Sequence, residues 1–167
     1  MLTPLFPPRE ALKAVSDGAS ELDLVINHPL LHAKSSGAFQ QVFDDIKAVR
    51  TACPAPIVLK CILETSQLSQ EEIVAACVIA CEAGADYLKT STGFCGEGAT
   101  RLTVALLRWV AERYGGRVKV KASGGIRSKE DVEGMVRAGA QRIGASAGLQ
   151  IMAEVEGMDK AGKEEGY

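Results

Sequence analysis

The 167-residue sequence carries almost no net charge and has no long apolar run. Nineteen Lys and Arg residues nearly balance 21 Asp and Glu residues, which leaves a net charge of −2 at pH 7. Without excess positive charge, the chain has no general attraction for nucleic acid or an anionic membrane surface. No segment approaches the length of a membrane span, and residues 1–8 lack the charged and apolar parts of a secretory signal. We therefore expect a cytoplasmic protein that binds neither nucleic acid nor membrane.

Potential metal ligands are also sparse. The two histidines, His28 and His32, could share a helical face, but no acidic or thiol side chain accompanies them in a metal-binding pattern. Five cysteines form an odd set in a chain large enough to build its own core, which favours reduced thiols over disulfides. Cys77 and Cys81 lie in an apolar stretch, where free cysteine usually acts as a small buried hydrophobe. The sequence therefore predicts no metal centre.

Short β-branched runs alternate with longer amphipathic stretches along the chain. The expected strands are residues 21–27, 57–63, 85–90, 117–122 and 142–145. The expected helices are residues 8–16, 38–52, 69–83, 100–114 and 128–138, with a short helix at 149–153. Ser69 and Ser128 each precede an acid by three residues, which is typical of a capping box. A glycine (Gly18, Gly84 or Gly139) precedes three of the strands and can end a helix in the left-handed conformation.

This alternation predicts one α/β domain whose parallel strands are joined by helical crossovers. Two architectures fit, an open doubly wound sheet or a (β/α) barrel. The strand faces favour the barrel, since four of the five expected strands carry a charged residue on the face opposite their apolar row. A sheet covered by helices on both sides would be apolar on both faces, whereas a barrel interior can be polar in its upper layer.

Several of these strand residues are lysines, which are rarely buried unless they are paired. Lys119 begins a strand and is expected to be exposed. Lys60 could contact a substrate or could form an ion pair with Glu64 on the same face of its strand. Lys89 and Lys121 each precede a loop of small residues at the carboxyl end of a strand, where ligands bind in both architectures.

Lys89 and Lys121 together indicate a Schiff-base site. Two close ammonium groups repel each other, and burial also disfavours the charged form, so one lysine should be neutral enough near pH 7 to attack a carbonyl. Asp23, on a neighbouring strand, would hold the second lysine charged and relay protons. Lysines in this arrangement also bind phosphate or form structural pairs, so the pattern leaves these alternatives open.

Glycine-rich loops follow the last two expected strands, at 123–128 and 144–148. Glycine allows backbone N–H groups to approach a phosphate, and the N-terminus of a following helix adds its positive dipole end. In barrels, phosphate is typically held by the loops after the seventh and eighth strands. The two loops therefore predict a phosphate site.

Five segments, taken together and in order, resemble the deoxyribose-phosphate aldolases, which are class I aldolases on a TIM barrel. These segments are residues 21–27, 59–65, 87–94, 120–127 and 142–146. The resemblance implies a TIM (β/α)8 barrel fold, here a partial barrel of about five parallel βα units over residues 1–153, followed by a polar C-terminal tail over residues 154–167. The family's three N-terminal strands have no counterpart before Pro8, although residues 1–6 look like the end of such a strand.

The resemblance also implies an activity, the reversible cleavage of 2-deoxy-D-ribose 5-phosphate into acetaldehyde and D-glyceraldehyde 3-phosphate in deoxyribonucleoside catabolism. Lys89 matches the Schiff-base lysine, Lys121 the second active-site lysine, and Asp23 the proton-relay aspartate. The positions that match the family's phosphate site are Gly93, Gly124, Gly125, Gly144 and Ser146. The protonated imine serves as the electron sink, so the resemblance implies no cofactor. The expected partners are a sugar phosphate and further copies of the chain.

The sequence predicts five strands, whereas the family has eight. This difference keeps a second function open. The chain could be a shortened protein that is catalytically weak or inactive and at most binds sugar phosphate. Two further residues enter the comparison with the family. Tyr167 matches a C-terminal tyrosine that some members carry near the site, and Ala147 stands where many members carry serine.

Overall fold

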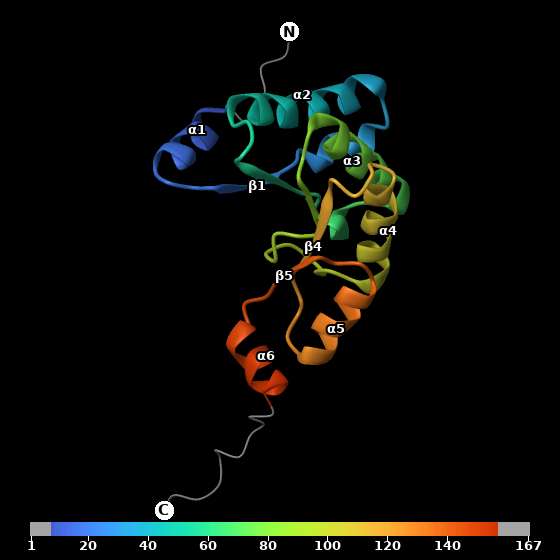
Figure 1. Cartoon of the computed structure of the whole chain (residues 1–167). Helices are drawn as coiled ribbons and strands as arrows, with labels where there is room; N and C mark the ends of the chain where they lie inside the picture. The colour runs from blue at the N-terminus through green and yellow to red at the C-terminus, as the bar shows by residue number, and fades with distance from the viewer. Residues whose placement is uncertain (1–7, 157–167) are drawn as a thin grey trace, which may run out of the picture.

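The computed structural model describes residues 8–156, which contain one sheet of five parallel strands (Figure 1). The strands are β1 (Glu21–Val25), β2 (Val58–Ile62), β3 (Tyr87–Lys89), β4 (Lys119–Ser123) and β5 (Arg142–Gly144). They lie side by side in chain order, so each crossover joins neighbouring strands. All five strands overlap the expected ranges, with ends that differ by at most two residues, which confirms the predicted parallel α/β arrangement.

The helices also fall close to the predicted ranges. They are α1 (Pro8–Ser16), α2 (Ser36–Ala52), α3 (Gln70–Ala83), α4 (Arg101–Glu112), α5 (Lys129–Arg137) and α6 (Gly148–Val155). Two short 3₁₀ helices, η1 (His28–Ala33) and η2 (Thr65–Gln67), follow β1 and β2 and were not expected. Helix α6 runs two residues past the domain end expected at residue 153. Residues 1–6 and Tyr167, which carried two of the sequence expectations, lie outside the described residues.

Local capping chemistry begins and ends these helices as the sequence predicts. Ser69 forms a complete capping box with Glu72 at the start of α3, and Ser128 forms one with Asp131 at the start of α5. Gly84 ends α3 with a φ of 100°, in the left-handed region that favours glycine. The helix boundaries at both ends of α3 are therefore set by residues within one turn of them.

The apolar core lies between the sheet and the layer of helices. Helices α2, α3, α4 and α5 follow one another along one side of the sheet (Figure 1). Buried strand residues facing them include Leu59, Cys61, Leu88, Val120 and Ala122. The other face of the sheet carries charged side chains: Glu21, Asp23, Lys60, Lys89, Lys121 and Arg142. This division confirms the predicted barrel-type sheet, with one apolar face and one polar face.

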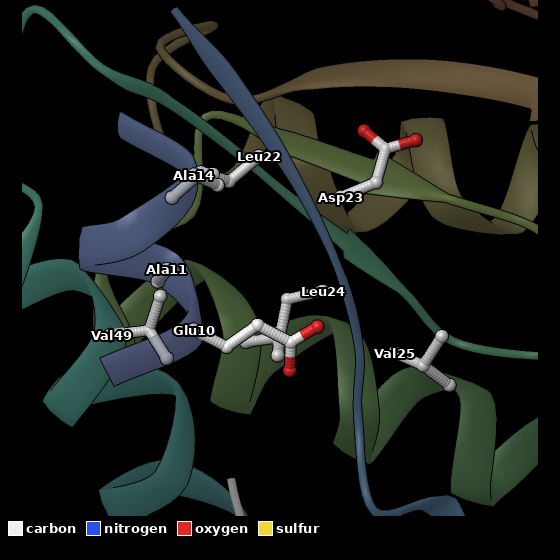
Figure 2. A pocket seen from close by; sticks show the side chains of 8 residues that line it. All are labelled: Glu10, Ala11, Ala14, Leu22, Asp23, Leu24, Val25 and Val49. Atoms are coloured by element: carbon white, nitrogen blue, oxygen red, sulfur yellow. The ribbon is translucent and has the colours of Figure 1, made fainter. Parts of the chain in front are cut away.

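Helix α1 packs beside β1. Successive side chains of β1 point to opposite faces of the strand. Leu22 and Leu24 point toward α1, while Asp23 points to the opposite side of the strand (Figure 2). A cavity of about 270 Å³ separates the helix from the strand and is lined mainly by apolar groups. None of the helices within residues 8–156 combines the length and apolar character needed to cross a membrane.

Candidate active site

Asp23, on β1, contacts lysines from the next three strands. Its Oδ1 accepts a hydrogen bond from Lys60 Nζ at 2.8 Å. Its Oδ2 accepts from Lys89 Nζ at 2.7 Å and from Lys121 Nζ at 3.3 Å. The strand registers place Asp23 beside Lys60 and Lys89 beside Lys121. The fold therefore brings together the three residues that the sequence marked as catalytic, although they are separated by up to 98 positions along the chain.

The pKa of Asp23 lies well below its ordinary range. Burial is the largest single influence and raises this pKa, but the hydrogen bonds from Lys60 and Lys89 and the positive charges of Lys89 and Lys121 together outweigh it. Asp23 is therefore ionised at neutral pH, and its negative charge is shared by the three ammonium groups.

The pKa of Lys121 is lowered. Desolvation is the largest cause, and repulsion from Lys89 and Lys60 adds to it, while the attraction of Asp23 opposes it. Lys121 thus loses its proton more readily than an isolated lysine, as expected for one member of a close pair. The structure differs from the expectation in one respect, since Asp23 makes its shorter contact with Lys89. The reason is that β3 lies one strand nearer to β1 than β4 does.

Lys60 does form ion pairs, but its partners are Glu21 and Asp23 and not the expected Glu64. Its ammonium group is 2.8 Å from Glu21 Oε2 and 2.8 Å from Asp23 Oδ1, and the residue is 4% exposed. The expected pair with Glu64 is wrong. β2 ends at Ile62, and Glu64 adopts a left-handed conformation with a φ of 55°, so its side chain leaves the face that carries Lys60.

Glu21 extends the charged network to the last strand. Its Oε2 accepts from Lys60 and from Arg142 Nη1, the latter at 2.6 Å. The hydrogen bonds from Arg142 and Lys60 lower the pKa of Glu21 to about 2. Arg142 also lies over the ring of Tyr87, at 4.7 Å from its centroid. A continuous set of ion pairs therefore links β1, β2 and β5.

A cavity of about 400 Å³ adjoins Lys89 and Lys121. Its lining includes the five residues predicted to surround a phosphate, namely Gly93, Gly124, Gly125, Gly144 and Ser146. Among the described residues 8–156, neither Asp23 nor Lys60 is part of the lining of this cavity. The structure therefore places the two lysines and both glycine-rich loops at one cavity, with Asp23 behind the lysines, and it does not bring Lys60 to this cavity.

The loop geometry limits which backbone groups could hold an anion. Asp131 Oδ2 accepts hydrogen bonds from the backbone N–H groups of Arg127 and Ser128, so these two donors at the start of α5 are already used. No side chain among the described residues caps the N-terminus of α6, which begins at Gly148, two residues after Ser146. The positive dipole end of α6 is thus the less occupied of the two helix termini beside the cavity.

Close approach of two loops shapes the same cavity. A Cβ at Gly98 would lie 2.2 Å from the backbone carbonyl carbon of Gly124, so only glycine fits there. Ala99 N–H donates to the Gly124 carbonyl at 3.0 Å and joins the two loops. The φ of Gly124 is 86°, which also favours glycine.

Sequence reasoning missed six further lining residues. They are Thr92, Phe94, Ser123, Ile126, Arg127 and Ala145. All six lie in loops or strand ends that contain a predicted site residue. Their closeness in sequence to those residues was the signal that could have identified them. The orientation of their side chains depends on contacts between loops, which the sequence pattern does not contain.

The DeoC/LacD family aldolase profile matches residues 7–155. The chain belongs to this family. The deoxyribose-phosphate aldolase of Coccidioides immitis is 54% identical over 133 residues, which are 80% of this chain and 48% of that protein. The deoxyribose-phosphate aldolase of Kocuria rhizophila is 50% identical over 80% of this chain and 59% of its own length. The chain therefore spans about half to three fifths of the length of these curated relatives.

Solved aldolase structures have the same arrangement of strands and helices. A deoxyribose-phosphate aldolase from Aeropyrum pernix, described as tetrameric, matches with a TM-score of 0.78 and 30% identity over 95% of this chain and 66% of that one. The five strands of this member of the DeoC/LacD family therefore correspond to part of a TIM barrel, as the sequence resemblance implied.

Proposed function

We propose that this DeoC/LacD aldolase reversibly cleaves 2-deoxy-D-ribose 5-phosphate into acetaldehyde and D-glyceraldehyde 3-phosphate. The observation that carries the proposal is the cavity that Lys89 and Lys121 share with two glycine-rich loops. A primary amine suits the aldehyde end of such a substrate, and exposed backbone N–H groups suit its phosphate. The two ends of one small sugar phosphate could thus be recognised in a single cavity.

Lys89 is the proposed nucleophile. Its Nζ attacks the C1 carbonyl of the open-chain sugar, and loss of water leaves a protonated imine between Nζ and C1. The C3 hydroxyl then loses its proton, the C2–C3 bond breaks, and its electron pair moves toward the iminium nitrogen. D-glyceraldehyde 3-phosphate leaves, and an enamine remains on Lys89. Protonation of C2 and addition of water to the imine release acetaldehyde and restore the amine.

Asp23 and Lys121 are the proposed proton carriers for these steps. The lowered pKa of Lys121 makes its amine available as a base, and its contact with Asp23 Oδ2 keeps it beside Lys89. Asp23 touches both ammonium groups through one oxygen, so it can stabilise either protonated lysine as the proton moves. Lys60, by binding the other oxygen, would orient the Asp23 carboxylate.

The phosphate would lie against Gly124, Gly125, Gly144 and Ser146, near the N-terminus of α6. We also propose that the chain acts in deoxyribonucleoside catabolism in the cytoplasm and that it assembles as a homo-oligomer. The tetrameric Aeropyrum pernix relative supports the last point.

Borohydride trapping tests the central step. The chain is incubated with acetaldehyde or deoxyribose 5-phosphate and reduced, and peptides are examined by mass spectrometry. We expect a stable adduct on Lys89, since reduction converts the imine into a secondary amine. The Lys89→Met variant should lose this adduct. The matched control is Lys119→Met, which removes an exposed lysine from β4 and should leave trapping unchanged.

An unmodified Lys89 in the wild-type chain would overturn the aldolase proposal. If sugar phosphate still raised the melting temperature in that case, the function would instead be binding without turnover. Catalytic turnover is measured separately, as release of acetaldehyde from deoxyribose 5-phosphate.

A further inference from the structure

Glu64 combines two unfavourable features at the end of β2. The residue is 2% exposed, and an unpaired buried carboxylate is costly. Its backbone is left-handed, with a φ of 55°, a conformation that is strained for a residue with a Cβ. Such strain persists where the surrounding structure requires it, and it concentrates at functional sites.

The carboxylate of Glu64 holds the loop that follows β3. Its Oε2 accepts from the Thr92 hydroxyl at 2.6 Å and from the Thr92 backbone N–H at 3.3 Å. The same Thr92 hydroxyl oxygen accepts from the Phe94 backbone N–H at 3.2 Å. The Thr92 hydroxyl thus donates its proton to Glu64, and the lone pairs of its oxygen remain available to accept from Phe94.

The second oxygen of Glu64 makes no comparable contact. Oε1 is buried and has no hydrogen-bond partner in the part of the chain that the structure describes. The side-chain hydrogen bonds of this carboxylate are therefore concentrated on Thr92. A hydrogen bond from a hydroxyl to a carboxylate is shorter and stronger than one between neutral groups, and burial strengthens it further.

The loop held in this way forms one wall of the cavity. Thr92, Gly93 and Phe94 all line it, and they begin three residues after Lys89. Gly93 has a φ of 93°, and a Cβ placed on it would come within 3.9 Å of Gly124 in the opposite loop. The position of this wall relative to the glycine-rich loop thus depends on a buried carboxylate that does not itself line the cavity.

We propose that Glu64 is a positioning residue, which acts through Thr92 to set the cavity wall where the phosphate of the substrate binds. This inference rests on the proposed function and assigns to Glu64 a part in affinity for the phosphate group. Attack by Lys89 on a small aldehyde depends on a different part of the site. Loss of the Glu64 carboxylate that holds Thr92 therefore weakens phosphate binding and leaves imine formation with acetaldehyde intact.

The test measures these two properties separately in the Glu64→Gln and Thr92→Val variants. Binding of inorganic phosphate is measured by calorimetry, and trapping of acetaldehyde on Lys89 is measured after borohydride reduction. We expect each variant to bind phosphate about 10-fold more weakly, as the loss of one charge-assisted hydrogen bond predicts. We expect acetaldehyde trapping by the Glu64→Gln variant to stay within about twofold of the wild type.

Three comparisons separate positioning from general stability. Thr92→Ser keeps the hydroxyl and should restore phosphate binding. The Glu64→Gln/Thr92→Val double variant should bind phosphate no more weakly than either single variant, because both remove the same interaction. Glu71→Gln, at an exposed position in the first turn of α3, is the control and should behave as the wild type.

The inference is overturned if the wild-type chain does not bind phosphate or if both variants bind it normally. It is also overturned if phosphate binding and acetaldehyde trapping fall by the same factor, which would indicate general loss of structure. If wild-type Lys89 forms no adduct but Glu64→Gln still weakens phosphate binding, the aldolase proposal fails while the role of Glu64 stands.

Discussion

Replacing Asp23 by Asn tests the charge arrangement at the centre of the site. The substitution keeps the size of the side chain and one carbonyl acceptor, and it removes the negative charge between Lys60, Lys89 and Lys121. The Lys89 and Lys121 nitrogens lie no more than 6.0 Å apart, because they are 2.7 and 3.3 Å from the same oxygen. Without Asp23, their repulsion is no longer compensated.

The size of the effect follows from burial. Removing one partner of a buried ion pair typically costs about 3–5 kcal/mol. The Asp23 side chain is 32% exposed, so water screens part of this loss, and we expect the free energy of unfolding to fall by about 2–3 kcal/mol. For a domain of this size, that corresponds to a decrease in melting temperature of roughly 5–10 °C.

Thermal unfolding at pH 7 measures the loss of stability, and Asp17→Asn is the control. Asp17 pairs with Lys13 on the surface and is 59% exposed, so its replacement should change stability by less than about 0.5 kcal/mol. Asp23→Asn should also increase the rate at which Lys121 is modified by an amine reagent at neutral pH, because Asp23 raises the pKa of this lysine. A decrease in melting temperature no larger than that of the control, or slower modification of Lys121, would refute this account.

Two further predictions concern acid stability and loop packing. Because Glu21 has a pKa of about 2 in the fold and an ordinary value near 4.5 when unfolded, its contribution is complete above pH 4.5 and is lost as the pH falls toward 2. Glu21→Gln should therefore reduce the dependence of melting temperature on pH between 4.5 and 2, and an unchanged slope would contradict this. Gly98→Ala should destabilise the chain by more than about 3 kcal/mol in urea denaturation, since its Cβ would lie 2.2 Å from backbone atoms of the opposite loop. Gly37→Ala, where a Cβ meets nothing within 4 Å, is the control; equal effects would show that the loops can separate at little cost.

The local elements of this protein are determined largely by the sequence itself. Ser69 and Ser128 begin helices through contacts within four residues, and Gly84 ends one through its own backbone conformation. The alternation of apolar and charged residues along the strands depends only on the period of two in an extended chain. These are short-range rules, so the order of strands and helices and the polar face of the sheet could be predicted without the fold.

The residues of the candidate site could be predicted from the sequence. The contacts between them could be predicted only in part. Lys89, Lys121 and Asp23 follow from their places in parallel strands, because neighbouring strands put equivalent positions side by side. The partners of Lys60 did not follow, since the left-handed turn at Glu64 breaks the alternation on which that expectation depended.

Tertiary structure alone decided which lysine lies closer to Asp23 and that Glu64 holds Thr92. Each of these contacts joins segments that are 28 or more residues apart, or depends on a loop conformation that no periodic pattern encodes. The sequence determined which groups reach the same end of the sheet, because strand direction and side-chain alternation are local properties. The distances between those groups depend on how the loops pack against one another, and this packing exists only in the folded chain.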